Sequence, residues 1–474
     1  MKQQAMNPYL PSWEYVPDGE PHVFGDRLYL FGSHDRFGGK GFCENDYVCW
    51  SAPVDDLSDW TFHGTIYRKE DDPANQHHFL LSLFAPDVVQ GPDGRYYLYY
   101  EVGGLPRISV AVCDTPAGKY EFYGVVRHAD GRLFGLRKGD RFPFDPGVLN
   151  DDGQVYLYTG FSLNLSSIGD GFGPLTASGS TCVVLEDDML TVREVKPLIP
   201  GSANSAGTGF EGHEFYEASS MRKFDGKYYF IYSSILSHEL CWAVSDYPDR
   251  DFQYGGILHS NSDYGLNGVR EHKNFYGNNH GSVEKISDNY YVFGHRQTNY
   301  DQHSRQGVAE KICFEDGKFY QAEITSQGLN GKPLVGKGTY EARIACNLLW
   351  HGGNTMITKV KDDGDTIGFT QEGADRDGPG GQYIHCVKQG DIIGFKYFDL
   401  KGLKEISVKV RGTAKGVFLV SQTEQGDPFC EIPIEAAEFY QNFSGMSNVP
   451  NGTSALYFRF EGEGALDFLS FELK

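Results

Sequence analysis

The sequence contains no apolar run that approaches the roughly 18 residues that a membrane-spanning helix needs. Its beginning, MKQQAMNPYLPSWEY, lacks the apolar centre of a secretory signal peptide. The nine cysteines form no CxxC pair and show no spacing typical of a metal site. We therefore expect no membrane span, buried reduced thiols and a cytoplasmic location.

Basic residues are scarce relative to acidic ones. The chain has 42 Lys and Arg against 64 Asp and Glu, which gives a formal net charge of −22. Such a surface repels nucleic acids and anionic lipids, and it also keeps a protein soluble whatever its function. The charge therefore argues against nucleic-acid and membrane partners and is compatible with a neutral ligand. It predicts no oligomeric state.

Aromatic residues and glycine are abundant, with 30 Tyr, 33 Phe and 59 Gly among 474 residues. This composition favours an all-β chain with many tight turns, and the length favours two domains. A pattern of ionisable residue, turn and short aromatic strand recurs five times in the first two thirds. The copies start at Asp18, Asp87, Asp145, Glu217 and His280, and their aligned tyrosines are Tyr29, Tyr97, Tyr156, Tyr229 and Tyr291.

Repeats of roughly 60 residues that each supply about four antiparallel strands are typical of a β-propeller. We therefore predict five blades. The innermost strand of each blade would place its ionisable residue near the central axis, so the five residues that start the copies would surround one axial pocket. An acid before Gly or Pro can also be a plain turn residue, and Asp145 in FDPG is equally compatible with that role.

Several carboxylates in one pocket favour glycoside hydrolysis. One carboxyl must be protonated to assist the leaving group, and another must be ionised to activate water or attack the sugar. A third acid raises the pKa of the proton donor by like-charge repulsion. Blades one and four lie on nearly opposite sides of a five-fold ring, and a separation of roughly 6.5–9.5 Å leaves room for a water molecule, which favours inversion.

Five signatures, in order between about residues 7 and 325, resemble glycoside hydrolase family 43: NPYLPSWEYVPDGEP, FAPDV, FDPGV, FYEASSMRK and GNNHGSV. The resemblance implies a five-bladed propeller and an inverting reaction. It makes Asp18 the general base, although the chain has PDG where many members of the family have ADP. It makes Glu217 the general acid and Asp87 the acid that tunes its pKa. It implies a neighbouring, non-catalytic role for Asp145 and a structural calcium ion near His280, with no organic cofactor.

Other side chains are weaker candidates around the carboxylates. Phe84 and Trp60 are candidate walls for a sugar, although both fit a hydrophobic core as well. Arg305 is a candidate donor to sugar hydroxyls, and His34 is a candidate contact at the rim. Glu214 lies three residues before Glu217 and would point to the opposite face of a strand, so we expect only Glu217 at the axis.

The repeats stop at about residue 325. We expect a catalytic propeller over residues 1–325 and a β-sandwich over 326–474, because short alternating strands such as ISVKVRG and ALYFRFEG fill the remainder. Through GFKYFDLKG, ISVKVRG and LDFLSF, this part resembles a family 6 carbohydrate-binding module. We favour a supporting role over sugar binding, because a cytoplasmic enzyme has little need to dock on a polymer.

These expectations point to an exo-acting, inverting glycosidase that removes single pentose-type sugars from neutral, plant-derived oligosaccharides. α-L-Arabinofuranosidase is the first candidate and β-xylosidase the second. A β-D-galactofuranosidase and a non-catalytic sugar-binding propeller are the alternatives. A retaining fructan-type propeller is disfavoured, because FDP and YEA stand where that class has RDP and EC.

Overall fold

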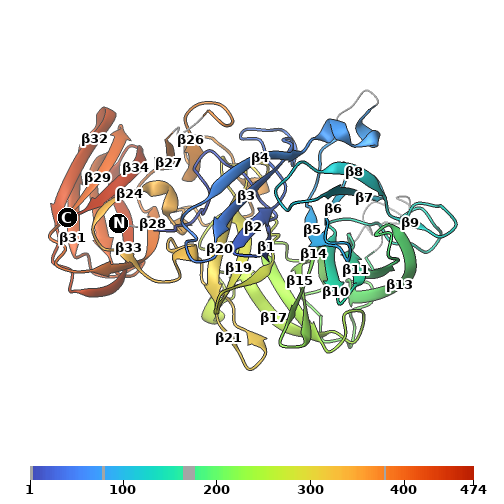
Figure 1. Cartoon of the computed structure of the whole chain (residues 1–474). Helices are drawn as coiled ribbons and strands as arrows, with labels where there is room; N and C mark the ends of the chain where they lie inside the picture. The colour runs from blue at the N-terminus through green and yellow to red at the C-terminus, as the bar shows by residue number, and fades with distance from the viewer. Residues whose placement is uncertain (1–3, 77–80, 164–176, 378–380) are drawn as a thin grey trace.

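The computed structural model describes residues 4–76, 81–163, 177–377 and 381–474. Regular structure in these ranges is almost entirely β-strand, with a few short 3₁₀ turns. Figure 1 shows two parts side by side: the chain from blue to yellow forms one, and the orange and red chain forms the other. In the part of the chain described here, no helix is long and apolar enough to cross a membrane.

Residues up to about 320 form five sheets of consecutive antiparallel strands, and in the third a short strand also pairs in parallel at the edge. The first two are β1 (Glu20–Phe24), β2 (Arg27–Phe31), β3 (Tyr47–Pro53) and β4 (Thr61–Tyr67), then β5 (Asp87–Gln90), β6 (Tyr96–Glu101), β7 (Ile108–Cys113) and β8 (Glu121–Val125). The third is β10 (Gly147–Asp151), β11 (Gln154–Thr159), β12 (Gly179–Leu185) and β13 (Thr191–Pro200), with β9 (Arg127–His128) at its edge. The fourth is β14 (Phe215–Phe224), β15 (Lys227–Ser234), β16 (Glu239–Ser245) and β17 (Gln253–Ser260), and the fifth is β18 (Val283–Ile286), β19 (Asn289–Arg296) and β20 (Gln306–Ile312). A small hairpin, β21 (Phe314–Glu315) and β22 (Lys318–Phe319), follows the fifth sheet.

The first strands of the five sheets form a closed ring. Each is joined to the next by at least one polar contact: His22 with Asp87, the Val148 amide with Asp87, the Ala218 amide with Asp145, Ser220 with Ser282, and a backbone bridge between Gly19 and Gly281. The ring closes from the fifth sheet back to the first. This arrangement confirms the predicted five-bladed β-propeller.

The five aligned tyrosines all lie on the second strands of their blades, as the repeat predicts. Tyr97 packs in a cluster that joins the second and third blades, and Tyr229 packs in one that joins the fourth and fifth. The repeated aromatic residues therefore fill the spaces between blades, which are the hydrophobic cores of a propeller.

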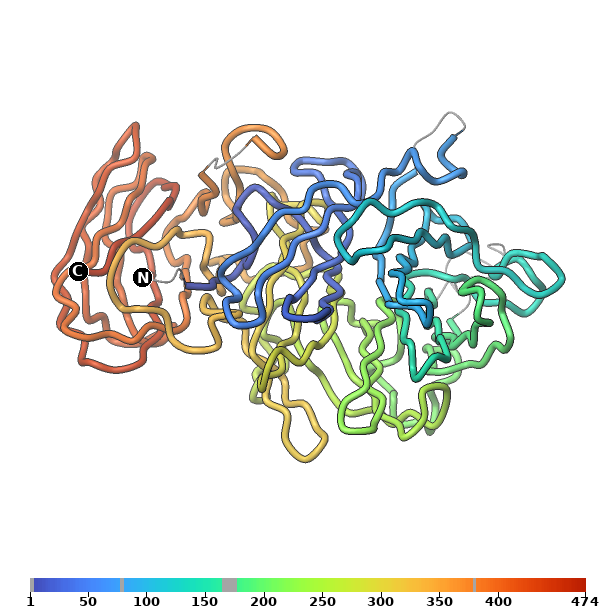
Figure 2. Tube along the Cα trace, viewed as in Figure 1, coloured from blue at the N-terminus to red at the C-terminus, as the bar shows by residue number. Residues whose placement is uncertain are grey.

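The remaining chain forms two packed sheets, which confirms the predicted sandwich. One holds β23 (Leu334–Val335), β25 (Asn347–Leu349), β28 (Ile392–Leu400), β30 (Lys415–Ser421), β31 (Cys430–Ile434) and β33 (Gly452–Glu463). The other holds β24 (Gly338–Glu341), β26 (Gly368–Gln371), β27 (Gln382–Val387), β29 (Glu405–Gly412), β32 (Ala437–Met446) and β34 (Leu466–Leu473). The predicted division at residues 325 and 326 falls between β22 and β23. The N-terminal segment lies beside the sandwich (Figure 2), where the Asn7 amide donates to the carbonyl of Ser326 at 3.0 Å.

Candidate active site

A pocket opens at the end of the propeller axis. Three carboxyl groups and one imidazole line it, from Asp18, Asp145, Glu217 and His280. Aromatic side chains form much of its wall, from Phe42, Phe84, Phe144, Phe161 and Tyr216, and Arg305, Gln302, Ser237, Gly277, Asn278, Met356 and Thr358 complete the lining. The pocket therefore joins a group of acids to flat apolar surfaces, as a sugar-binding site requires.

The prediction that Asp87 is the third acid of this pocket is wrong in its geometry. Asp87 is fully buried below the pocket and is not part of its lining. Tyr29 pairs with a residue four positions after Asp18, and Tyr156 pairs with one four positions after Asp145. Tyr97 pairs with Val89, only two positions after Asp87. Asp87 therefore lies two residues further along its strand, roughly 7 Å deeper.

Asp145 takes the place predicted for Asp87. Asp18 and Asp145 also share an uncommon backbone conformation, with φ of 56° and 46°. Left-handed backbone is strained for most residues, although Asp tolerates it better than many, and such strain gathers at functional sites. Glu217 is followed by Ala218 at φ 66°, within an irregular stretch of the pairing between β14 and β15. A bulge of this kind re-aims a side chain, here toward the pocket.

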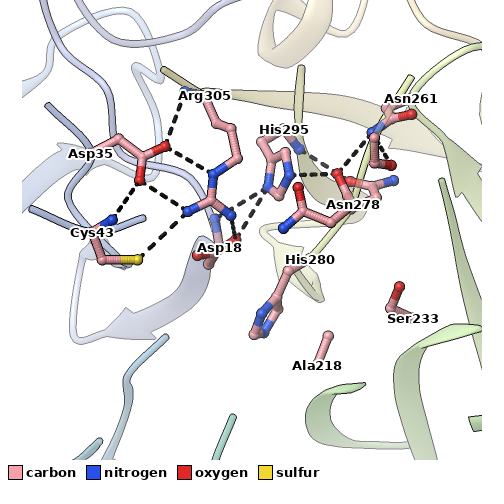
Figure 3. Close-up of polar contacts among 12 residues, drawn as sticks. Asp18, Asp35, Cys43, Ala218, Ser233, Asn261, Asn278, His280, His295 and Arg305 are labelled. Atoms are coloured by element: carbon pink, nitrogen blue, oxygen red, sulfur yellow. Dashed lines mark hydrogen bonds and ion pairs between the residues drawn. The ribbon is translucent and has the colours of Figure 1, made fainter. Parts of the chain in front are cut away.

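Arg305 and His295 surround the carboxylate of Asp18 (Figure 3). The guanidinium Nη1 donates to Oδ1 of Asp18 at 2.9 Å, while Nε donates to Oδ2 of Asp35 at 2.8 Å. Nδ1 of His295 lies 3.3 Å from the same oxygen of Asp18, and its Nε2 donates to the carbonyl of Asn278 at 2.7 Å. Burial alone would raise the pKa of Asp18, but Arg305 and His295 hold it below its ordinary value. Asp18 is therefore ionised.

Glu217 has the opposite electrostatic environment. Burial and the negative charge of Asp18 raise the pKa of Glu217 to about 7, against a smaller opposing effect of Arg305. Burial and the neighbouring Glu217 also raise the pKa of Asp145, whose Oδ2 accepts from the Ala218 amide at 3.1 Å. One pocket thus holds an ionised carboxylate and a carboxyl that keeps its proton near neutral pH. This pair supports acid and base catalysis at the same centre.

The structure separates the other predicted site residues into two groups. Phe84 and Arg305 line the pocket, as predicted. Trp60 instead packs in the core of the first blade with its ring 5.3 Å from that of Tyr9, and His34 is buried against Glu14, with Nε2 and Oε1 2.9 Å apart. Neither lines the pocket, because hydrophobic packing holds Trp60 elsewhere and a buried hydrogen bond holds His34.

Several lining residues are absent from the sequence prediction. Phe144 and Tyr216 immediately precede Asp145 and Glu217, so an aromatic residue directly before an acid was a usable signal. His295, which contacts Asp18, had no such signal, because it lies on β19, far from Asp18 in the sequence.

The described side chains around His280 do not form a calcium cage. Calcium prefers six to eight oxygen ligands, whereas His280 offers a nitrogen, with Nδ1 3.5 Å from Oδ2 of Asp145. Among the described residues, two groups of three or more potential metal ligands occur, and neither includes His280. One of them, Glu20, His22 and Asp87, lies on the axis, but Arg222 already pairs with Glu20 at 2.8 Å.

Comparison with known proteins decides the family. The family model described as glycosyl hydrolases family 43 matches residues 14–319, about two thirds of the chain. The chain belongs to glycosyl hydrolase family 43.

Relatives with this family's fold cover both parts of the chain. A xylosidase/arabinosidase of Thermoclostridium stercorarium is 49% identical over 100% of this chain and 99% of its own. An arabinoxylan arabinofuranohydrolase of Paenibacillus polymyxa is 30% identical over 98% of this chain and 73% of its own. The crystal structure of a family 43 arabinoxylan arabinofuranohydrolase from Bacillus subtilis shares the fold at a TM-score of 0.50 and 18% identity, over 99% of this chain and 97% of that one. The chain is therefore a glycoside hydrolase with a propeller and an appended sandwich.

Proposed function

We propose that this glycoside hydrolase releases single pentose-type sugars from neutral oligosaccharides, with terminal α-L-arabinofuranose and β-xylose as its two substrates. The observation that carries the proposal is the pair of opposite pKa shifts, downward for Asp18 and upward for Glu217, in one aromatic pocket. The xylosidase/arabinosidase that is 49% identical along its whole length supports the pentose class.

In the proposed reaction, the carboxyl of Glu217 gives its proton to the glycosidic oxygen as the bond to the leaving group breaks. Asp18 accepts a proton from the water that attacks the anomeric carbon from the opposite face, so the released sugar has the inverted configuration. Arg305 keeps Asp18 ionised. Asp145, rather than Asp87, is the third acid. Asp145 and Glu217 oppose each other's ionisation, and Asp145 also orients the sugar.

The test is a screen of nitrophenyl α-L-arabinofuranoside, β-xyloside and β-D-galactofuranoside with the wild type, Asp18→Asn and Glu217→Gln. We expect hydrolysis of the first two, reduced roughly 10³-fold in each variant. NMR of the first-formed sugar should show the inverted anomer. Hydrolysis of the galactofuranoside alone would replace the pentose assignment. Sugar binding without any hydrolysis would favour a binding propeller.

Two further expectations belong to this proposal. We propose that a calcium ion near His280 would take most of its ligands from water, because the side chains there supply too few oxygens. Metal analysis before and after dialysis against a chelator tests it. We also propose a reducing, cytoplasmic location, which is supported by nine cysteines that are all unpaired.

A further inference from the structure

The active-site pocket is not built by the propeller alone. Met356 and Thr358 line it, and both lie on the loop between β25 and β26 of the sandwich part, beyond the residues that the family model matches. We propose that these two side chains form part of the subsite for the leaving group, so that the C-terminal part selects which oligosaccharide is cleaved. This inference rests on the proposed glycosidase function.

The loop is fixed to the propeller at one point. Residues 355–357 run beside Tyr276: a backbone bridge joins Met356 to Tyr276, the Tyr276 amide donates to the carbonyl of Thr355 at 3.3 Å, and the Ile357 amide donates to the carbonyl of Tyr276 at 2.6 Å. Two residues after Tyr276, the carbonyl of Asn278 accepts the hydrogen bond from His295, which contacts Asp18. A segment of three residues therefore sets the position of Met356 relative to the proposed base.

The loop is fixed to the sandwich as well. Ile357 is buried in the core of the sandwich, and Phe275 from the propeller packs in that same core. The side chain of Asn354 closes the base of the loop, donating to the carbonyl of Leu348 at 2.8 Å. In Figure 1, β26 and β27 lie on the side of the sandwich that faces the propeller. Anchoring on both sides makes the loop a rigid wall, and rigid walls discriminate between ligands at low entropic cost.

The exposure of these residues places them at the mouth of the pocket. Asp18 and Asp145 are 4% exposed, whereas Met356 is partly exposed and Thr358 is exposed. The terminal sugar must lie against the carboxyl groups, so the mouth receives the next sugar unit. A thioether suits the apolar face of a sugar ring, and a hydroxyl can donate to or accept from its hydroxyl groups.

The experiment measures binding in the Glu217→Gln background, so that it does not depend on hydrolysis. A linear pentose trisaccharide and the free pentose are titrated calorimetrically into Glu217→Gln and into Glu217→Gln with Met356→Ala. We expect roughly tenfold weaker binding of the trisaccharide in the double variant, which is typical of losing a small apolar contact. We expect less than about twofold change for the free pentose, which occupies only the inner position.

Matched variants control for the fold of the loop. Met356→Leu keeps an apolar side chain of similar size and should restore most of the affinity for the trisaccharide. Lys359→Ala alters an exposed residue of the same loop outside the pocket lining and should bind both sugars like the parent. Equal weakening of both sugars, an unchanged trisaccharide affinity, or no binding of either sugar overturns the inference. Lack of hydrolysis by the wild type, with the expected binding pattern intact, overturns only the proposed function.

Discussion

Two layers of ionisable side chains follow one another along the propeller axis, and they behave differently. The upper layer, Asp18, Asp145 and Glu217, lines the pocket. The lower layer, Glu20, His22, Asp87 and Arg222, is buried or half-buried beneath it. In the lower layer, both oxygens of Asp87 have partners, since Oδ1 lies 2.6 Å from Nε2 of His22 and Oδ2 accepts from the Val148 amide at 2.7 Å.

The two layers differ in the arginine that pairs with their acidic side chains. In the lower layer, the guanidinium of Arg222 donates to Glu20. In the upper layer, the guanidinium of Arg305 donates to Asp18. Burial raises the pKa of Glu217 to about 7 and that of Glu20 to about 8, but only Glu217 also lines the pocket, as a general acid must. The same repeat therefore builds a structural layer and a reactive layer about two residues apart.

Asp145→Asn and Asp87→Asn form the sharpest test of the difference between the layers, because one aspartate belongs to each. Asn tolerates the left-handed backbone of residue 145, so we expect a folded Asp145→Asn variant with kcat lowered roughly 100-fold. Asp87→Asn loses charge-assisted contacts in the lower layer, so we expect a lower melting temperature and near-normal kcat per folded molecule. A large loss of kcat in Asp87→Asn with a mild effect of Asp145→Asn would contradict the assignment.

Arg222 tests the structural role of the lower layer. Its guanidinium is 2.8 Å from Glu20 and 3.6 Å from Glu284, and its removal takes away the cation that opposes the effect of burial on the pKa of both acids. We expect Arg222→Met to lower the free energy of unfolding by about 3–5 kcal/mol, measured by urea denaturation. Arg250→Met is the matched control from the same blade, because Arg250 is half exposed and its partner Asp249 keeps a second cation, Lys196, at 2.5 Å. The control should cost less than about 1 kcal/mol, and equal losses would contradict the distinction.

The repeat predicted the propeller because hydrophobic period and turn residues are local properties of each blade. It also predicted an axial pocket lined by the residues that start the copies, and four of the five line it: Asp18, Asp145, Glu217 and His280. It misassigned Asp87 because the hairpin between β5 and β6 has a longer loop than the hairpin between β1 and β2, and this hides the shift in pairing register. Spacing along the chain does not reveal register, which depends on hydrogen bonds between strands.

Contacts between segments that are far apart in the sequence could not be predicted from local patterns. Trp60 has the side chain of a sugar-binding platform but packs against Tyr9. Tyr9 lies about fifty residues away in the sequence, and no local pattern relates the two residues. Met356 reaches the pocket only because the sandwich docks on the propeller, which no motif in the loop signals. Side chains supplied by the repeat were therefore predictable, and those supplied by docking were not.

The smallest expected effect is on the pH dependence of kcat/KM, which reports on the carboxyl groups of the upper layer. Because the pKa of Glu217 is about 7, kcat/KM should fall about tenfold per pH unit above pH 7, while the lowered pKa of Asp18 should leave it constant down to about pH 4. Arg305 favours the ionised form of both acids, so Arg305→Gln should raise both pKa values and move both limbs of the profile to higher pH by up to about one unit. Arg305→Lys keeps the positive charge and should move them less. An alkaline limb that stays in place in Arg305→Gln would mean that Glu217 does not sense this guanidinium, and the proton donor would then lie elsewhere in the pocket.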